Sequence, residues 1–246
     1  ETAFWLESDR MLSLAFDKKS LEVQRSVVIE EFKQRYLNQP YGDVWLLLKP
    51  LAYKVHPYQW NTIGKEISHI ENATMDEVKD FFKKFYHPAN AIMVVAGPIE
   101  LEKVKEWSQK WFGTIPAQAK DQRNLPAEPA QTEARKLVVY RDVPANSIYK
   151  AWHIGKRTDK SYHHFDLISD ILSNGKSSRL YLNLVKEKKM FTEINAYVSG
   201  DLDNGLFIVS GKLIAGTNVE NAEKEIDLAV YQFVEEKLAE NELQKV

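Results

Sequence analysis

Residues 192–213 read TEINAYVSGDLDNGLFIVSGKL, and this stretch decides the fold class of the chain. Apolar and β-branched residues gather in 192–199 and in 205–213, with Asp203-Asn204-Gly205 at the junction. Asn-Gly readily takes the positive φ angles of a tight turn, so the stretch predicts a hairpin of two antiparallel strands.

The segments around this hairpin extend the pattern. Residues 136–141 and 147–154 predict two earlier strands joined around Pro144. Residues 165–184, interrupted near Asn174-Gly175, and residues 219–238 predict amphipathic helices. The order strand, strand, helix, strand, strand, helix predicts an α+β fold with helices packed on a mainly antiparallel sheet.

The earlier part of the chain predicts mostly helices, over 1–36, 43–51, 74–85 and 100–112. Thr74 and Glu77 form a capping-box pattern at the start of the third of these. The apolar run Ala91–Ala96 predicts a buried strand. Three prolines lie among polar residues at 116–135, and from them we predict a domain at 1–116, a linker at 117–135 and a second domain at 136–246.

Composition excludes several classes of function. The 246 residues are 44% hydrophobic, enough for a buried core, and the chain has no cysteine for disulfides, thiol nucleophiles or cysteine-ligated metals. Lys and Arg number 33 against 35 Asp and Glu, so there is no basic excess and we expect no nucleic-acid partner. No apolar run approaches the roughly 18 residues of a membrane-spanning helix, and we expect no membrane span.

The candidate functional residue is Glu31, within residues 25–32 (RSVVIEEF). Adjacent helical residues point about 100° apart, so Glu31 and Glu30 lie on different faces. Glu31 shares its face with Val27-Val28, and if that face is interior its carboxylate is costly unless it is paired or binds a metal. A metal ligand and an i,i+4 ion pair with Arg35 both remain open from the residues alone.

Several stretches, in the family's order and over nearly the whole chain, resemble the insulinase (pitrilysin) family of zinc metallopeptidases, which includes the mitochondrial processing peptidases. The stretches are residues 5–11 (WLESDRM), residues 25–32, His56-Pro57-Tyr58 with Thr62-Ile63-Gly64, Tyr86-His87-Pro88-Ala89-Asn90, and Ser177-Ser178-Arg179-Leu180-Tyr181.

This resemblance implies two homologous α+β domains enclosing a chamber. It also implies a zinc site made of an inverted His-x-x-Glu-His motif, whose Glu is the general base, and a Glu from a later helix. By its place in Arg25-x-x-Val28-x-x-Glu31, that later metal ligand is Glu31. His-x-x-Glu-His is absent from these residues. We therefore expect an internal fragment with both domains incomplete, no catalytic residue of its own and no zinc bound by the fragment alone.

Some positions depart from the pattern of catalytic members. Gln24 stands where the family often has a Glu, and Val185 and Thr192 stand where catalytic members have an Arg and a Tyr that help to polarise the substrate carbonyl. Lys186 is an imperfect substitute for that Arg. In some relatives the catalytic groups are shared between two homologous subunits, so that one subunit binds the zinc and its partner carries the Arg and Tyr.

Two interpretations follow from the resemblance. In the first, the parent protein is a zinc endopeptidase that acts on peptide substrates, with a homologous partner subunit or as a homodimer. In the second, it is a non-catalytic, insulinase-like partner or structural subunit. The sequence identifies no substrate-binding residue. It also leaves the compartment open, since the resemblance is compatible with a bacterial cell envelope or periplasm and with an organelle.

Overall fold

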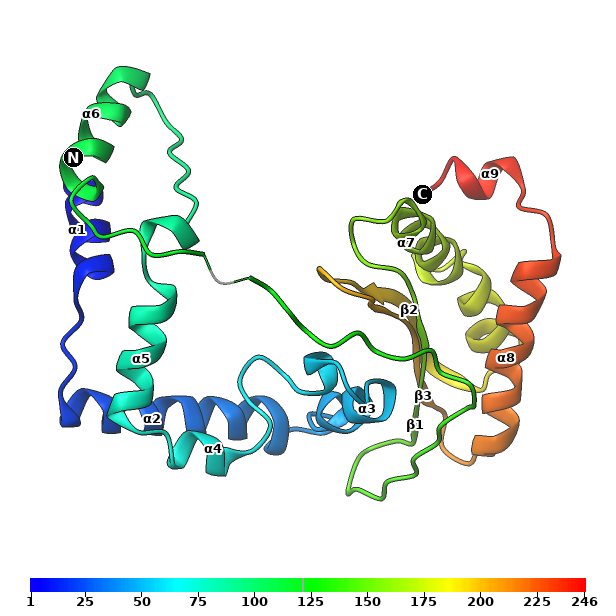
Figure 1. The fold of residues 1–246 in the computed structure, drawn as a ribbon. Helices are drawn as coiled ribbons and strands as arrows, with labels where there is room; N and C mark the ends of the chain where they lie inside the picture. The colour runs from blue at the N-terminus through cyan, green and yellow to red at the C-terminus, as the bar shows by residue number, and fades with distance from the viewer. Residues whose placement is uncertain (121) are drawn as a thin grey trace. The chain divides into compact units, whose positions relative to one another are not determined.

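The computed structural model describes residues 1–120 and 122–246, which fall into two compact units. Unit 1 is Glu1–Ala127 and unit 2 is Glu128–Val246. Figure 1 traces the chain from the helices of unit 1 to the sheet of unit 2. The division lies inside the proline-containing segment at 117–135.

Unit 1 is built from helices and turns. The helices are α1 (Thr2–Leu12), α2 (Lys18–Phe32), which runs on into a π-helical turn (Lys33–Leu37), α3 (Val44–Ala52), α4 (Ile67–Glu71), α5 (Met75–Phe85) and α6 (Leu101–Phe112). The predicted capping box is confirmed, because the Glu77 amide donates to Thr74 Oγ1 at 3.3 Å and the Thr74 amide donates to Glu77 Oε2 at 2.7 Å.

Little of unit 1 is buried. Helix α1 packs on α6, where the Phe4 ring meets Trp107 edge-on at 5.6 Å and Phe112 at 6.4 Å between centroids. Helix α2 packs on α4. Among the described residues of this unit, the buried apolar side chains are Phe4, Phe32, Ala52, Tyr53 and Ile115.

The prediction of a buried strand at Ala91–Ala96 is wrong for this chain. The segment belongs to no strand, and the side chains of Ile92 and Val94 are 94% and 84% exposed. A strand requires a hydrogen-bonded neighbour, and the described residues of unit 1 contain no strand that could supply one.

Unit 2 contains the sheet. Its elements are β1 (Ser147–His153), α7 (Lys160–Ser173), a π-helical turn (Tyr181–Glu187), β2 (Phe191–Ser199), β3 (Leu206–Leu213), α8 (Val219–Glu235) and α9 (Glu240–Leu243). The strands form an antiparallel sheet in the order β1-β3-β2. The predicted α+β class is confirmed. No helix within the described ranges is long and apolar enough to cross a membrane.

The core of unit 2 lies between this sheet and its helices, and Figure 1 shows α7 and α8 on the same side of the sheet. The register aligns Ile148 of β1 with Gly211 of β3 and Ile194 of β2. Fully or almost fully buried members of the core are Leu172, Leu180, Leu184, Phe191, Val209, Leu213, Ala222 and Ile226.

The predicted hairpin is confirmed, because β2 and β3 are antiparallel neighbours. Its turn differs from the prediction, since neither Asn204 nor Gly205 has a positive φ angle. A Cβ atom on Gly205 would lie 2.3 Å from the Ser199 carbonyl oxygen. Gly205 is therefore needed because two backbone segments approach closely, not because a turn is left-handed.

The strand predicted at residues 136–141 is not part of this sheet. Strand β1 pairs with β3, and residues 136–141 make no ladder with it. Tyr140 is 88% exposed. The prediction of a strand at these residues is therefore wrong, because the structure assigns 136–141 to neither a helix nor a strand.

Candidate functional site

Glu31 lies near the end of α2. The helix begins at Asp17, whose side chain accepts a hydrogen bond from the Ser20 amide at 2.9 Å, a standard N-cap. The Glu31 side chain is 49% exposed, and its Oε1 lies 3.0 Å from a guanidinium nitrogen of Arg35. The i,i+4 ion pair considered from the sequence is therefore present. Glu30 points elsewhere and pairs with Lys33 at 2.7 Å.

The valine face of α2 is not interior in this chain. Val27 is 53% exposed, whereas Val28 is partly covered and Phe32 is buried. The covered stripe of the helix runs through Leu21, Arg25, Val28 and Phe32, at steps of three and four residues. Glu31 lies beside this stripe, so its carboxylate is open to solvent and not directed inward.

Arg25 is the residue of this helix whose role the sequence reasoning missed. Its side chain is 19% exposed. Nε donates to the Ile70 carbonyl at 3.2 Å and a terminal nitrogen donates to the Ala73 carbonyl at 2.6 Å, while the same guanidinium also pairs with Glu22. These bonds tie α2 to the end of α4, whose last carbonyl groups have no partner within the helix. Arg25 therefore fixes the helix that carries Glu31.

The donor set for a metal is incomplete. Among residues 1–120 and 122–246, no group of three or more His, Asp or Glu side chains is placed to hold an ion. Zinc in proteins needs at least three protein ligands, and Glu31 supplies one carboxylate. The described residues alone therefore do not form a zinc site.

Residues 72–246 match the family described as "Peptidase M16 inactive domain". The chain belongs to the insulinase (peptidase M16) family.

Individual M16 relatives extend the similarity. The chain is 30% identical over 250 residues to "Zinc protease PqqE" of Helicobacter pylori, across 98% of this chain and 55% of the relative. It is 28% identical over 110 residues to "Mitochondrial-processing peptidase subunit beta" of Saccharomyces cerevisiae, across 44% of this chain and 23% of that protein. The crystal structure of a protease from Helicobacter pylori matches with a TM-score of 0.87 and 28% identity, across 99% of this chain and 60% of that one. The chain thus spans little more than half the length of these Helicobacter proteins.

Two motifs that resemble the M16 family have structural roles here. His56 is buried, and its Nδ1 accepts a hydrogen bond from the Tyr58 amide at 3.1 Å, which caps the 3₁₀ turn Pro57–Gln59. Arg179 donates to both carboxylate oxygens of Glu242, at 2.7 and 2.8 Å, and so holds α9. This bidentate pair lowers the pKa of Glu242 to about 2, helped by a hydrogen bond from the Ala239 amide.

Val185 and Thr192 lie at the positions that the resemblance aligns with the Arg and Tyr of catalytic members. Val185 packs against the core of unit 2, and Lys186 beside it is exposed. Thr192 lies in a β-bulge of β2, where its hydroxyl donates to the Lys212 carbonyl at 3.2 Å. These side chains therefore serve the fold of unit 2.

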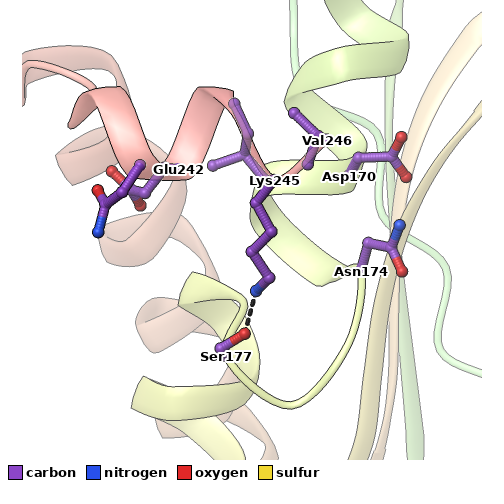
Figure 2. A pocket seen from close by; sticks show the side chains of 8 residues that line it. Asp170, Asn174, Ser177, Glu242, Lys245 and Val246 are labelled. Atoms are coloured by element: carbon purple, nitrogen blue, oxygen red, sulfur yellow. Dashed lines mark hydrogen bonds between the residues drawn. The ribbon is translucent and has the colours of Figure 1, made fainter.

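Unit 2 has a small pocket beside the end of α7. Asp170, Asn174 and Ser177 line it together with residues of α9 and residues that follow it, and Figure 2 shows Lys245 reaching toward Ser177. The Lys245 ammonium group contacts the Ser177 hydroxyl, and Glu242 is held by Arg179. Three of its lining residues, Ser177, Glu242 and Lys245, thus already have partners, and we assign the pocket no chemistry.

Proposed function

We propose that the chain is part of a zinc metallopeptidase of the insulinase family and that Glu31 is the third protein ligand of the zinc. The exposure of Glu31 carries the proposal. Its carboxylate is open to solvent, and its partner Arg35 is itself 59% exposed. An exposed ion pair of this kind contributes about 0.3–0.5 kcal/mol, so exchanging Arg35 for a metal ion costs little.

The remaining parts of the site lie outside the described residues in this proposal. A His-x-x-Glu-His motif elsewhere in the parent protein provides the two histidine ligands and the general base. Zinc, when bound, supplies an activated water for hydrolysis of a peptide bond. The chain alone, with one ligand, should retain little or no zinc and should not cleave peptides.

The names of relatives support peptide substrates, since they include a zinc protease and a processing-peptidase subunit. Because one relative is a subunit of a processing peptidase, we also expect the protein to act with a homologous partner or as a homodimer. In such an assembly, this chain contributes the zinc-binding side, because Val185 and Thr192 replace the Arg and Tyr that the partner would carry.

A second candidate function is that of a non-catalytic partner or structural subunit. The match to the inactive-domain family favours it, since the matched residues 72–246 leave Glu31 out. Gln24 favours it as well, because it stands where the family often has a Glu, two helical turns from Glu31 on the same face. An altered His-x-x-Glu-His motif in the parent protein would support this function and reject the enzymatic one.

The test is Glu31→Gln in the complete protein, with zinc content measured by mass spectrometry and peptide cleavage measured alone and with any homologous partner. Glu30→Gln is the matched control, because Glu30 is an adjacent, exposed carboxylate on the same helix that pairs with Lys33. Zinc content should fall in Glu31→Gln and stay unchanged in Glu30→Gln. Equal zinc content in all three proteins would reject Glu31 as a ligand.

A further inference from the structure

The dipeptide Asn174-Gly175 lies in the exposed break that follows α7. The Asn174 amide donates to the Asp170 carbonyl at 2.8 Å and so closes the last turn of the helix. Gly175 has a φ angle of 80°, and a Cβ atom added to it would have no neighbour within 4 Å. The backbone here is therefore open, and glycine gives it a freedom of rotation that other residues lack.

The peptide group that joins these two residues is not held in place. Among the residues that the structure describes, neither the Asn174 carbonyl nor the Gly175 amide has a hydrogen-bond partner, and the exposed Asn174 side chain has none either. The next carbonyl, that of Gly175, is fixed, because it accepts from the Ser178 amide at 3.2 Å and from Ser178 Oγ at 2.7 Å. The free peptide group thus lies between two anchored points, α7 and Ser178.

An asparagine that precedes a glycine can lose ammonia without an enzyme. The glycine amide nitrogen attacks Cγ of the asparagine side chain, the bond from Cγ to Nδ2 breaks, and the side-chain nitrogen leaves as ammonia with the proton that the amide gave up. Water then opens the cyclic succinimide at either of its carbonyl groups, which gives aspartate or isoaspartate. Glycine favours this reaction because it has no side chain to obstruct the attack.

Ring closure at Asn174 requires a rotation about its Cα–C bond, because its ψ angle of 105° turns the Gly175 nitrogen away from the Asn174 side chain. An opposite rotation in the φ angle of Gly175 lets the peptide group turn without moving α7 or Ser178. Glycine tolerates the full range of φ that this movement needs. The structure therefore allows the attacking geometry to be reached without unfolding of the helix.

The second Asn-Gly dipeptide of unit 2, Asn204-Gly205, is held on both sides. The Gly205 amide donates to the Gly155 carbonyl at 3.5 Å, and the Ile154 amide donates to the Gly205 carbonyl at 2.9 Å. Gly205 is buried, and a Cβ atom on it would lie 2.3 Å from the Ser199 carbonyl oxygen. Its amide nitrogen is thus already bonded, and the peptide group has no space in which to rotate.

We propose that Asn174 is a site of spontaneous deamidation in the folded chain and that Asn204 is protected from this reaction by the packing around Gly205. The product carries a carboxylate at the C-terminal end of α7, where the helix dipole disfavours negative charge. Asn174 and Asp170 both line the pocket that Lys245 enters (Figure 2). Deamidation therefore adds a second carboxylate from the α7 side to this pocket.

Peptide mapping by mass spectrometry tests the proposal, because each deamidation adds one dalton. The chain is incubated in mildly alkaline buffer, once folded and once in urea. In the folded chain Asn174 should react at least about tenfold faster than Asn204, since the backbone around Gly205 must first open locally. In urea the two sites should react at similar rates, because both are Asn-Gly. Equal rates in the folded chain, or an unreacted Asn174 there, would overturn the proposal. A difference of the same size in urea would also overturn it, because flanking residues and not the fold would then be its cause.

Three variants give a second measurement by ion-exchange chromatography. The aged wild type should accumulate an acidic species that elutes with freshly prepared Asn174→Asp, which carries the charge of the product. Asn174→Gln should not accumulate it, because the longer side chain closes a larger and less favourable ring. Asn204→Gln is the matched control and should accumulate it at the wild-type rate. Accumulation at the wild-type rate in Asn174→Gln would reject Asn174 as the reactive site.

Discussion

Replacement of Arg25 by Met should loosen the helix that carries Glu31. Met keeps the apolar stem and removes the guanidinium group, which donates to the Ile70 and Ala73 carbonyls at 3.2 and 2.6 Å. A hydrogen bond to a charged group contributes about 1.5–3 kcal/mol. Since the side chain is 19% exposed and water can reach the freed carbonyls, we take the lower value for each bond. The free energy of unfolding of unit 1 should fall by about 3 kcal/mol.

Urea unfolding followed by tryptophan fluorescence measures this change. The signal reports mainly on unit 1, because five of the six tryptophans lie there and the sixth is Trp152. Arg35→Met is the matched control, since its exposed pair with Glu31 is worth less than about 1 kcal/mol. The reasoning is refuted if Arg25→Met costs less than about 1 kcal/mol, or if Arg35→Met costs as much as Arg25→Met.

Two further predictions concern unit 2. Leu184→Ala, at a fully buried core position, should lower the free energy of unfolding by about 2–5 kcal/mol. Leu167→Ala, at a 39% exposed position of α7, should lower it by less than about 1 kcal/mol. Chemical denaturation measures both changes, and similar losses for the two variants would contradict the assigned core. Arg179 lowers the pKa of Glu242 from 4.5 to about 2. The ion pair therefore stabilises folded unit 2 at pH values above 4.5, and this stabilisation is lost as the pH falls from 4.5 toward 2. Over that window, thermal unfolding should show the wild type losing about 1 kcal/mol more than Glu242→Gln, and parallel curves would argue against the pair.

The sequence predicts the helices and the hairpin because their signals are local. The capping box at Thr74 and the helix break near Gly175 need information from only a few neighbouring residues, and both are present in the structure. The strands at Ala91–Ala96 and 136–141 could not be settled in this way. A strand is completed by its partner, and the apolar pattern of one strand does not say whether a partner exists.

The same limit applies to the candidate site. The spacing of Glu31 and Arg35 predicts their ion pair, because both lie on one helix. The bonds from Arg25 to α4 join residues 45 and 48 positions apart, and nothing in the local pattern specifies them. One signal was available, since Arg25 falls in the covered stripe with Leu21, Val28 and Phe32, where a charged residue needs a partner.

The unequal interiors of the two units have a practical consequence. Residues 128–246 form their buried core within the unit, between its sheet and its helices, so we expect this half to fold when it is produced by itself. Residues 1–127 leave Ile92, Val94 and Phe81 in contact with water. In isolation that half should aggregate more readily than residues 128–246.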